Sequence, residues 1–256
     1  MMRVVKIGGR AQADPRIANV LRQAWSESPS ALCVVHGGGD EISAMQHALG
    51  KEASFVGGRR VTSRDDLELL RMVLSGAVNK RLVNMLVAAG VPAVGVSGED
   101  DALIGAEVID AASLGFAGRP TVINVRLLRT LLSDGYMPVI SPVGYDVTSG
   151  KGGTLNVNGD DAASAIAASL EAEELLLIAD VEGVRGANGD LVPVLGIESA
   201  QGLIANGVAT GGMAAKLESA HAALLAGVNR VRICDLAGLV DSERGTFITQ
   251  SQGVAS

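Results

Sequence analysis

The sequence is poor in aromatic residues and in cysteine. Aromatic residues make up only 2% of the 256-residue chain, while hydrophobic residues reach 48%, so the core must be aliphatic. Such a composition suits α/β proteins, whose buried parallel strands read as continuous apolar runs. The only two cysteines, Cys33 and Cys234, lie in separate apolar runs without a C-x-x-C spacing. We therefore expect both to be buried thiols in a reducing cytosol.

Long apolar runs and an excess of positive charge are also lacking. No apolar run approaches the roughly eighteen residues that a membrane helix needs, and the opening MMRVVKIGG has no signal-peptide apolar region. The net charge is −7, which argues against non-specific binding to nucleic acid or to an acidic membrane. We expect a cytoplasmic protein with no nucleic-acid or membrane partner, in which local cations meet any anionic ligand.

Several common catalytic motifs are absent. Neither G-x-x-x-x-G-K-[ST] nor G-x-G-x-x-G occurs, so phosphate binding would need another arrangement. The three histidines lack metal-ligand spacing, and there is no H-E-x-x-H and no nucleophile elbow. The sequence therefore predicts no metal site built from protein side chains, and it assigns the histidines structural or surface positions.

Apolar runs alternate with helical patterns along most of the chain. Strands are predicted at residues 3–7, 31–36, 92–97, 137–143, 174–180 and 230–235. Helices are predicted at about 15–26, 40–50, 64–89, 124–134, 159–171 and 212–227. This alternation predicts an α/β fold, a three-layer αβα sandwich around a mostly parallel central sheet. Residues 103–122 interrupt the rhythm and predict an antiparallel hairpin.

Glycines follow several of the predicted strands. Gly8 and Gly9 come after the first strand, and Gly37 to Gly39 come after the second. Open α/β sheets bind ligands at the carboxyl ends of their strands, and glycine-rich turns at helix starts can bind anions. The three glycines alone are equally consistent with a tight turn between strand and helix.

Four polar residues stand in unusual places. Lys6 lies inside an apolar strand, where a lysine is costly unless it has a purpose or reaches solvent. Asn156, Asn158 and Asp160 alternate, so one stretch of extended chain would put all three on one face. Helix N-capping is the alternative, but it explains one such residue rather than three.

Two further polar pairs favour simple explanations. Arg59 and Arg60 precede a capped helix, and although an arginine fork matches a carboxylate, a solvated basic turn explains them from the residues alone. Asn79 and Lys80 are expected on the exposed face of the long helix 64–89, which is long enough to form a dimer contact.

Together the motifs resemble those of the amino-acid kinase family. The matches run in family order from residue 4 to about 217: VVKIGG, VVHGGGDEIS, FVGGRRVTSRDDLELLRMVLSGAVNKRLV, VGVSGED, LGFAGRP, GYMPVISPVG, LNVNGDDAASAIA, ADVEGV and GGMAAKL. The pattern is most similar to members of that family that act on acetylglutamate. The resemblance implies that ATP phosphorylates the side-chain carboxylate of N-acetyl-L-glutamate, the second step of arginine biosynthesis, with Mg²⁺ bound mainly through the ATP phosphates.

The resemblance also implies roles for particular residues. Lys6 and Lys216 match the two catalytic lysines, and Asp160 matches the carboxylate that organises them. The substrate-binding positions would be Gly38, Gly39, Arg60, Asn156 and Asn158. The nucleotide-binding positions would be Gly8, Gly9, Asp180, Val181, Glu182, Gly183, Val184, Arg185, Val208, Ala209, Thr210 and Gly212. Residues 1–173 would form a lobe for acetylglutamate and dimerisation, and residues 174–256 a lobe for ATP.

The chain departs from the family pattern in places. The family often has GLRVT where this chain has GRRVT, so Arg60 is the matching residue and Arg59 is an addition. The first strand begins at Arg3, without the helix that accompanies hexamers and arginine inhibition in the family, and we therefore expect a homodimer.

Two alternatives stay open. One is a sister kinase that acts on glutamate or aminoadipate attached to a small acidic carrier protein. The other is a non-catalytic ligand sensor on the same fold, against which the joint presence of Lys6, Asp160 and Lys216 argues.

Overall fold

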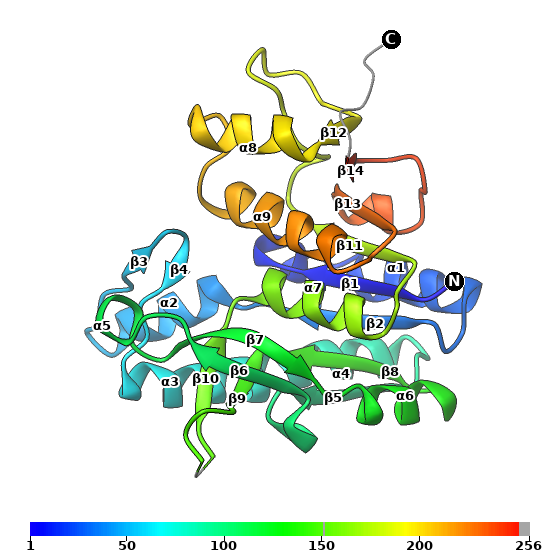
Figure 1. Cartoon of the computed structure of the whole chain (residues 1–256). Helices are drawn as coiled ribbons and strands as arrows, with labels where there is room; N and C mark the ends of the chain where they lie inside the picture. Colours follow the sequence, from blue (N-terminus) through cyan, green and yellow to red (C-terminus); the bar gives the residue numbers. More distant parts are fainter. Residues whose placement is uncertain (151, 251–256) are drawn as a thin grey trace.

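A twisted eight-stranded sheet forms the centre of the molecule (Figure 1). The computed structural model describes residues 1–150 and 152–250, so residue 151 of the first predicted lobe and residues 251–256 of the second lie outside the description. Six neighbouring strands run parallel in the order β13-β11-β1-β2-β8-β5, and β14 and β12 extend the β13 edge. The strands are β1 (Arg3–Ile7), β2 (Leu32–His36), β5 (Ala93–Ser97), β8 (Met137–Ser141), β11 (Glu174–Ile178), β12 (Val194–Gly196), β13 (Arg230–Cys234) and β14 (Thr246–Thr249).

Helices cover both faces of this sheet, which confirms the predicted three-layer α/β fold. Helices α7 and α9 lie side by side on one face, and α1 and α4 lie on the other (Figure 1). The longer helices are α1 (Ile17–Glu27), α2 (Gly39–Ala48), α3 (Arg64–Arg71), α4 (Asn79–Ala88), α6 (Arg126–Ser133), α7 (Gly159–Ser169), α8 (Ile197–Ala205) and α9 (Gly211–Leu225). Short helical turns are η1 (Gly9–Ala13), η3 (Asp100–Ala102), α5 (Ala111–Leu114) and η4 (Leu236–Leu239).

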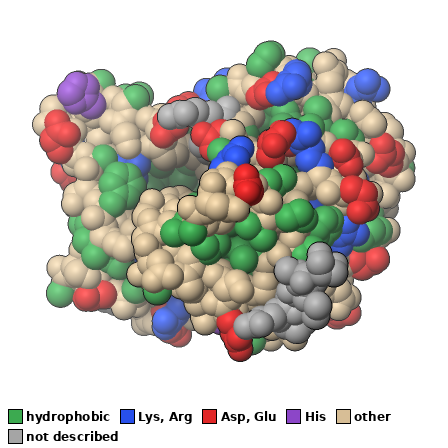
Figure 2. Space-filling model, turned by 90° about the horizontal axis from the view of Figure 1, so that it is seen from above, with side chains coloured by type: hydrophobic (Ala, Val, Ile, Leu, Met, Phe, Trp, Pro, Cys, Tyr) green, Lys and Arg blue, Asp and Glu red, His purple; other side chains and the backbone are tan. Residues whose placement is uncertain are grey.

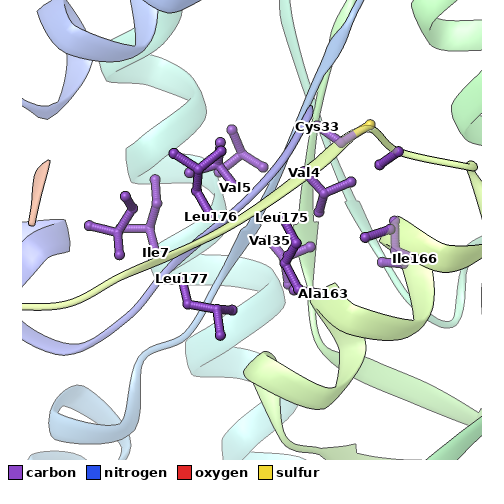
Figure 3. Close-up of a cluster of buried hydrophobic side chains, with 14 of the residues drawn as sticks. Val4, Val5, Ile7, Cys33, Val35, Ala163, Ile166, Leu175, Leu176 and Leu177 are labelled. Carbon is purple, nitrogen blue, oxygen red and sulfur yellow. The ribbon is translucent and has the colours of Figure 1, made fainter. Parts of the chain in front are cut away.

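Strand alternation decides which face each residue of β1 serves. Val4 packs on the same side as Ala163 and Ile166 of α7, while Val5 points to the opposite side (Figure 3). Because successive side chains of a strand point to opposite faces, Lys6 shares the α7 side with Val4. The strand is buried on both faces, as its continuous apolar run predicts.

Four short strands form a second, closed sheet in front of the first. They are β6 (Ile104–Val108), β7 (Ala117–Ile123), β9 (Val143–Asp146) and β10 (Thr154–Val157). Strands β6 and β7 pair antiparallel, which confirms the hairpin predicted for residues 103–122. β3 (Phe55–Val56) and β4 (Arg59–Arg60) form a separate small hairpin on the left of Figure 1.

The predicted helix 64–89 is helical throughout but not uniform. A π-helical segment, η2 (Met72–Val78), separates α3 from α4. The expectation that Asn79 is exposed is wrong: its side chain is buried, and its amide nitrogen donates to the Val139 carbonyl and contacts His36. Helix α4 lies against the sheet at this point, so Asn79 faces β8 and not solvent.

The two predicted lobes share one sheet. β1 pairs with β11 along its whole length, from Arg3 opposite Glu174 to Ile7 opposite Ile178. Both cysteines are buried, as predicted. Among the helices of residues 1–150 and 152–250, none is long and apolar enough to cross a membrane.

Candidate active site

A cavity of about 650 Å³ opens at the carboxyl ends of β1 and β11. Its walls come from the β3–β4 hairpin on one side and the start of α9 on the other. From above, the surface is hollowed between the smaller left-hand part of the molecule and the larger right-hand part (Figure 2). The lining includes twelve of the predicted site residues: Lys6, Gly8, Gly38, Gly39, Arg60, Asn156, Asn158, Asp160, Asp180, Val181, Gly212 and Lys216.

Two lysines meet one carboxylate at the centre of the cavity. Lys6 Nζ lies 3.0 Å from Asp160 Oδ1, and Lys216 Nζ lies 3.1 Å from each oxygen of the same carboxylate. The exposed fractions of Lys6, Asp160 and Lys216 are only 7%, 4% and 9%. Residues from β1, α7 and α9, distant in sequence, are thereby joined in one buried group.

The three charges do not cancel. Burial alone would raise the pKa of Asp160, but the two lysine ammonium groups outweigh burial and hold that pKa below its usual value. Burial, and then repulsion from Lys6, lowers the pKa of Lys216 to about 8, although Asp160 acts in the opposite direction. With both lysines charged, the group carries one net positive charge in a site of reduced polarity, where an anion is strongly attracted.

Glycines make room for the Lys6 side chain. A Cβ at Gly8 would lie 2.4 Å from Lys6 Nζ, and a Cβ at Gly159 would lie 3.1 Å from Lys6 Cε. Any side chain at Gly8 would therefore displace the Lys6 ammonium. The next residue, Gly9, begins η1.

Asn156, Asn158 and Asp160 do not lie in the single extended stretch that the sequence predicts. Strand β10 ends at Val157, and Asn158 caps α7, with its side-chain oxygen accepting from the backbone N–H groups of Asp160 and Asp161. Asp160 lies in the first helical turn. Both interpretations of the pattern therefore hold in part, because Asn158 is a cap and all three residues line the same cavity.

The glycine turn after β2 is tightly covered. A Cβ at Gly38 would lie 2.6 Å from Leu74 Cδ2 and 3.3 Å from Val78 Cγ2, both in the π-helical segment. Gly39 begins α2, and this helix start, whose first N–H groups have no acceptor within the helix, lies in the cavity lining. Such a helix start favours negative charge.

Arg60 is buried and fixed by side chains that the sequence interpretation missed. Its Nη2 donates to the Gly39 carbonyl at 2.9 Å and to Ser43 Oγ at 2.8 Å, and its Nη1 donates to Gln46 Oε1. The guanidinium also stacks on the Phe55 ring, 4.7 Å from its centroid. A solvated basic turn is therefore the wrong description of Arg60. The missed signal was Gln46, a polar residue one turn after Ile42 on the buried face of α2.

A second polar layer supports these walls. Asn156 Nδ2 donates to Thr62 Oγ1 at 2.9 Å. Below the glycine turn, His36 is buried, with its ring nitrogens against the Gly37 carbonyl and Asn79. Burial lowers the pKa of His36 to about 4, so the ring is neutral at pH 7. This agrees with the structural role expected of the histidine.

The nucleotide-binding positions predicted from the resemblance divide into two groups. Gly8, Asp180, Val181 and Gly212 line the cavity, and Gly9 begins η1. Nothing lies within 4 Å of a Cβ built at Gly211 or Gly212, so the start of α9 is open. The remaining positions lie beyond the cavity lining, in the 182–185 loop or in the approach to α9: Glu182, Gly183, Val184, Arg185, Val208, Ala209 and Thr210.

Two of these outer residues have partners of their own. Glu182 pairs with Arg244 at 2.8 Å, and Arg185 donates to the Gly189 carbonyl at 2.8 Å. In the part of the chain that the structure describes, no three His, Cys, Asp or Glu side chains gather closely enough to hold a metal ion.

The amino acid kinase family matches residues 1–235. The acetylglutamate kinase of Paracoccus denitrificans is 43% identical over 235 residues, covering 91% of this chain and 76% of that protein. The acetylglutamate kinase of Geobacillus stearothermophilus is 44% identical over 226 residues, covering 86% and 84%. The crystal structure of smu.665 from Streptococcus mutans superposes with a TM-score of 0.87 at 31% identity, covering 98% of this chain and 99% of that one.

Proposed function

Since the chain belongs to the amino acid kinase family, we infer that it is an ATP-dependent acetylglutamate kinase. It phosphorylates the side-chain carboxylate of N-acetyl-L-glutamate, giving N-acetyl-L-glutamyl 5-phosphate and ADP, the second step of arginine biosynthesis. The relatives from Paracoccus and Geobacillus support the substrate. One structural observation carries the chemistry: two buried lysines meet Asp160 in the centre of the cavity.

The reaction needs alignment and charge stabilisation rather than a base. The attacking carboxylate is ionised near neutral pH. One of its oxygens forms a bond to the γ-phosphorus, while the bond from that phosphorus to the bridging oxygen breaks and ADP leaves with its electron pair. No proton is moved, so positioning and electrostatic stabilisation supply the catalysis.

Lys6 and Lys216 would flank the transferring phosphoryl group. They approach Asp160 from two different elements, β1 and α9, and both line the cavity. Their positive charges offset the repulsion between the carboxylate and ATP, and they oppose the charge that spreads over the phosphoryl oxygens. Asp160 orients both ammonium groups and lowers the cost of burying them.

We assign the acetylglutamate half of the cavity to Gly38, Gly39, Arg60 and Asn156, in the lobe formed by residues 1–173. Arg60 offers a fixed guanidinium for a carboxylate of the substrate. The backbone of the glycine turn offers N–H donors at the start of α2. Asn158 contributes to this half as the cap that positions Asp160.

We assign the nucleotide half of the cavity to Gly8, Asp180, Val181 and Gly212. All but Gly8 belong to the lobe that begins at residue 174. The phosphates would lie against the open start of α9 and against Gly8, where a Cβ would meet Lys6. The loop residues 182–185 and 208–210 would then hold the adenosine from outside the lining. Mg²⁺ would be bound mainly through the ATP phosphates, because Asp160 is already paired with both lysines; Asp40 and Asp180 are the other carboxylates of the lining.

We further propose that the protein is cytoplasmic and homodimeric. The long helical stretch 64–88, whose exposed side chains include Met72 and Val87, is the contact that we propose between two copies. Light scattering should give twice the chain mass over a range of concentrations. A concentration-independent hexamer would overturn this.

The test is a side-by-side ATP-consumption assay. N-acetyl-L-glutamate, glutamate, aspartate and N-acetyl-aminoadipate are each supplied with ATP and Mg²⁺, and hydroxylamine traps any acyl phosphate as a hydroxamate. We expect turnover and hydroxamate with N-acetyl-L-glutamate above all. Activity with none of the four would instead favour a carrier-linked substrate or a ligand sensor.

A further inference from the structure

A second network of polar side chains lies beside the two lysines and Asp160. Arg59 Nη1 forms an ion pair with Asp161 Oδ2, and Ser219 Oγ donates to Asp161 Oδ1 at 2.8 Å. Arg59 belongs to β4, Asp161 to α7 and Ser219 to α9. The ion pair is largely shielded from solvent. One carboxylate therefore joins the hairpin, the helix that carries Asp160, and the helix that carries Lys216.

The hairpin is bound to the rest of the molecule through its two arginines. Adjacent residues of a strand point in opposite directions, and Arg60 contacts α2 while Arg59 reaches α7. The strands β3 and β4 pair with each other in a two-stranded sheet, and Phe55 and Val56 are exposed. Its arginine contacts therefore fix the hairpin over the acetylglutamate half.

The contacts between α7 and α9 at the other end of this polar network are equally direct. Asp160 and Asp161 are neighbours on α7, and Lys216 and Ser219 lie one turn apart on α9. The pairs Asp160–Lys216 and Asp161–Ser219 therefore fix α9 to α7 at two adjacent points. The hairpin also approaches α9 by itself, because a Cβ at Gly58 would lie 3.8 Å from the Gly211 carbonyl.

We propose that Arg59 is a positioning residue that couples the two halves of the cavity, so that each substrate tightens the binding of the other. The inference rests on the proposed function. A nucleotide bound at the start of α9 would fix Ser219 and Asp161, and through Arg59 would hold the hairpin over acetylglutamate.

The rival role for Arg59 is direct contact with the transferring phosphoryl group, since Arg59 also lines the cavity. The two roles predict different kinetics. Loss of a direct contact lowers turnover by about 10²–10³. Loss of coupling leaves turnover at saturating substrate within a few-fold and weakens the mutual effect of the substrates instead.

The experiment measures coupling by calorimetry. N-acetyl-L-glutamate is titrated into the full protein with and without a saturating non-hydrolysable ATP analogue and Mg²⁺, for wild type, Arg59→Leu, Arg59→Lys and Ser219→Ala. Coupling between sites typically changes affinity about 5–150-fold. We expect Arg59→Leu to remove most of that factor, and Ser219→Ala and Arg59→Lys to remove part of it. The reverse titration must give the same factor, because coupling is reciprocal.

Controls separate the outcomes. Arg129→Leu, an exposed arginine on α6, should leave the coupling factor unchanged, and circular dichroism should show each variant folded. Arg59→Leu with wild-type coupling, or a wild type that binds both ligands without coupling, overturns the inference alone. A turnover loss above a hundredfold with coupling retained assigns Arg59 to the phosphoryl group instead. A wild type that neither binds nor phosphorylates N-acetyl-L-glutamate overturns the proposed function itself.

Discussion

The two halves of the cavity are built in different ways. In the acetylglutamate half, Gly38 is covered by Leu74 and Val78, and Arg60 is fixed by hydrogen bonds to three partners. In the nucleotide half, Gly211 and Gly212 have open space around them. On the proposed assignment, the first half would recognise its ligand with side chains fixed in advance, and the second would offer backbone that a ligand can approach closely.

The largest expected effect lies where the halves meet. Lys6→Ala and Lys216→Ala should each lower turnover by about 10²–10³, because each removes a buried cation that we propose flanks the transferring phosphoryl group. An ADP-release assay at saturating substrates measures this. Lys51→Ala, on a more exposed lysine beyond α2, should keep normal turnover. Near-normal turnover in either cavity variant would remove that lysine from the mechanism.

Two glycine-to-alanine substitutions, one in each half of the cavity, test whether the halves differ in packing. Gly38→Ala should destabilise the fold by roughly 1–3 kcal/mol, because the added methyl forces Leu74 to shift in a packed region. The displaced Leu74 also lines the cavity, so binding of acetylglutamate should weaken.

Gly212→Ala should leave thermal stability unchanged or slightly raised, because its Cβ meets nothing and alanine favours a helix. Its expected defect is a higher KM for ATP only. Thermal unfolding followed by circular dichroism compares the two variants. Equal losses of stability would show that the halves do not differ in packing.

Gln46→Leu should weaken acetylglutamate binding without affecting ATP. The change removes the acceptor for Arg60 Nη1, and a hydrogen bond to a charged group is worth about 1.5–3 kcal/mol. We expect KM for N-acetyl-L-glutamate to rise about tenfold or more, with KM for ATP constant. Gln23→Leu, an exposed glutamine on α1, is the control. A parallel rise in both KM values would mean that Arg60 serves both halves.

The mildest effect is the pH dependence. The pKa of Lys216 is lowered to about 8, so in the free enzyme its charge is lost as pH rises through that value. The ratio kcat/KM for ATP should therefore decline above about pH 8, whereas kcat should hold to higher pH, because bound phosphates stabilise the charged lysine. In Lys216→Arg the decline should disappear from this range. An unchanged profile in that variant would assign the decline to another group.

Long periodic patterns made the central fold predictable from sequence. The six parallel strands are mostly apolar, and each was predicted to within a few residues. Strands β9, β10, β12 and β14 are only three or four residues long and carry no such pattern. Their place is set by pairing with distant strands, which the sequence does not display.

The centre of the site was also predictable, because Lys6 and the 156–160 set are unusual in an apolar context. The residues that support this centre were not predictable from the sequence. Asn79 looks like an ordinary polar helix residue and Gln46 like a surface residue, yet both are buried through contacts with distant segments. Arg59 and Asp161 meet across about a hundred residues, and only the fold brings them together.

The pairing of β1 with β11 has a consequence for synthesis. Residues 3–7 form the second half of their hydrogen bonds only after residues 174–178 have left the ribosome. At ordinary translation rates of about 5–20 residues per second, β1 lacks its β11 partner for on the order of ten seconds. An apolar segment left unpaired for so long invites aggregation, and charges within such a segment act as gatekeepers. Arg3 and Lys6 interrupt this one, so the lysine assigned here to phosphoryl transfer would also protect the nascent chain.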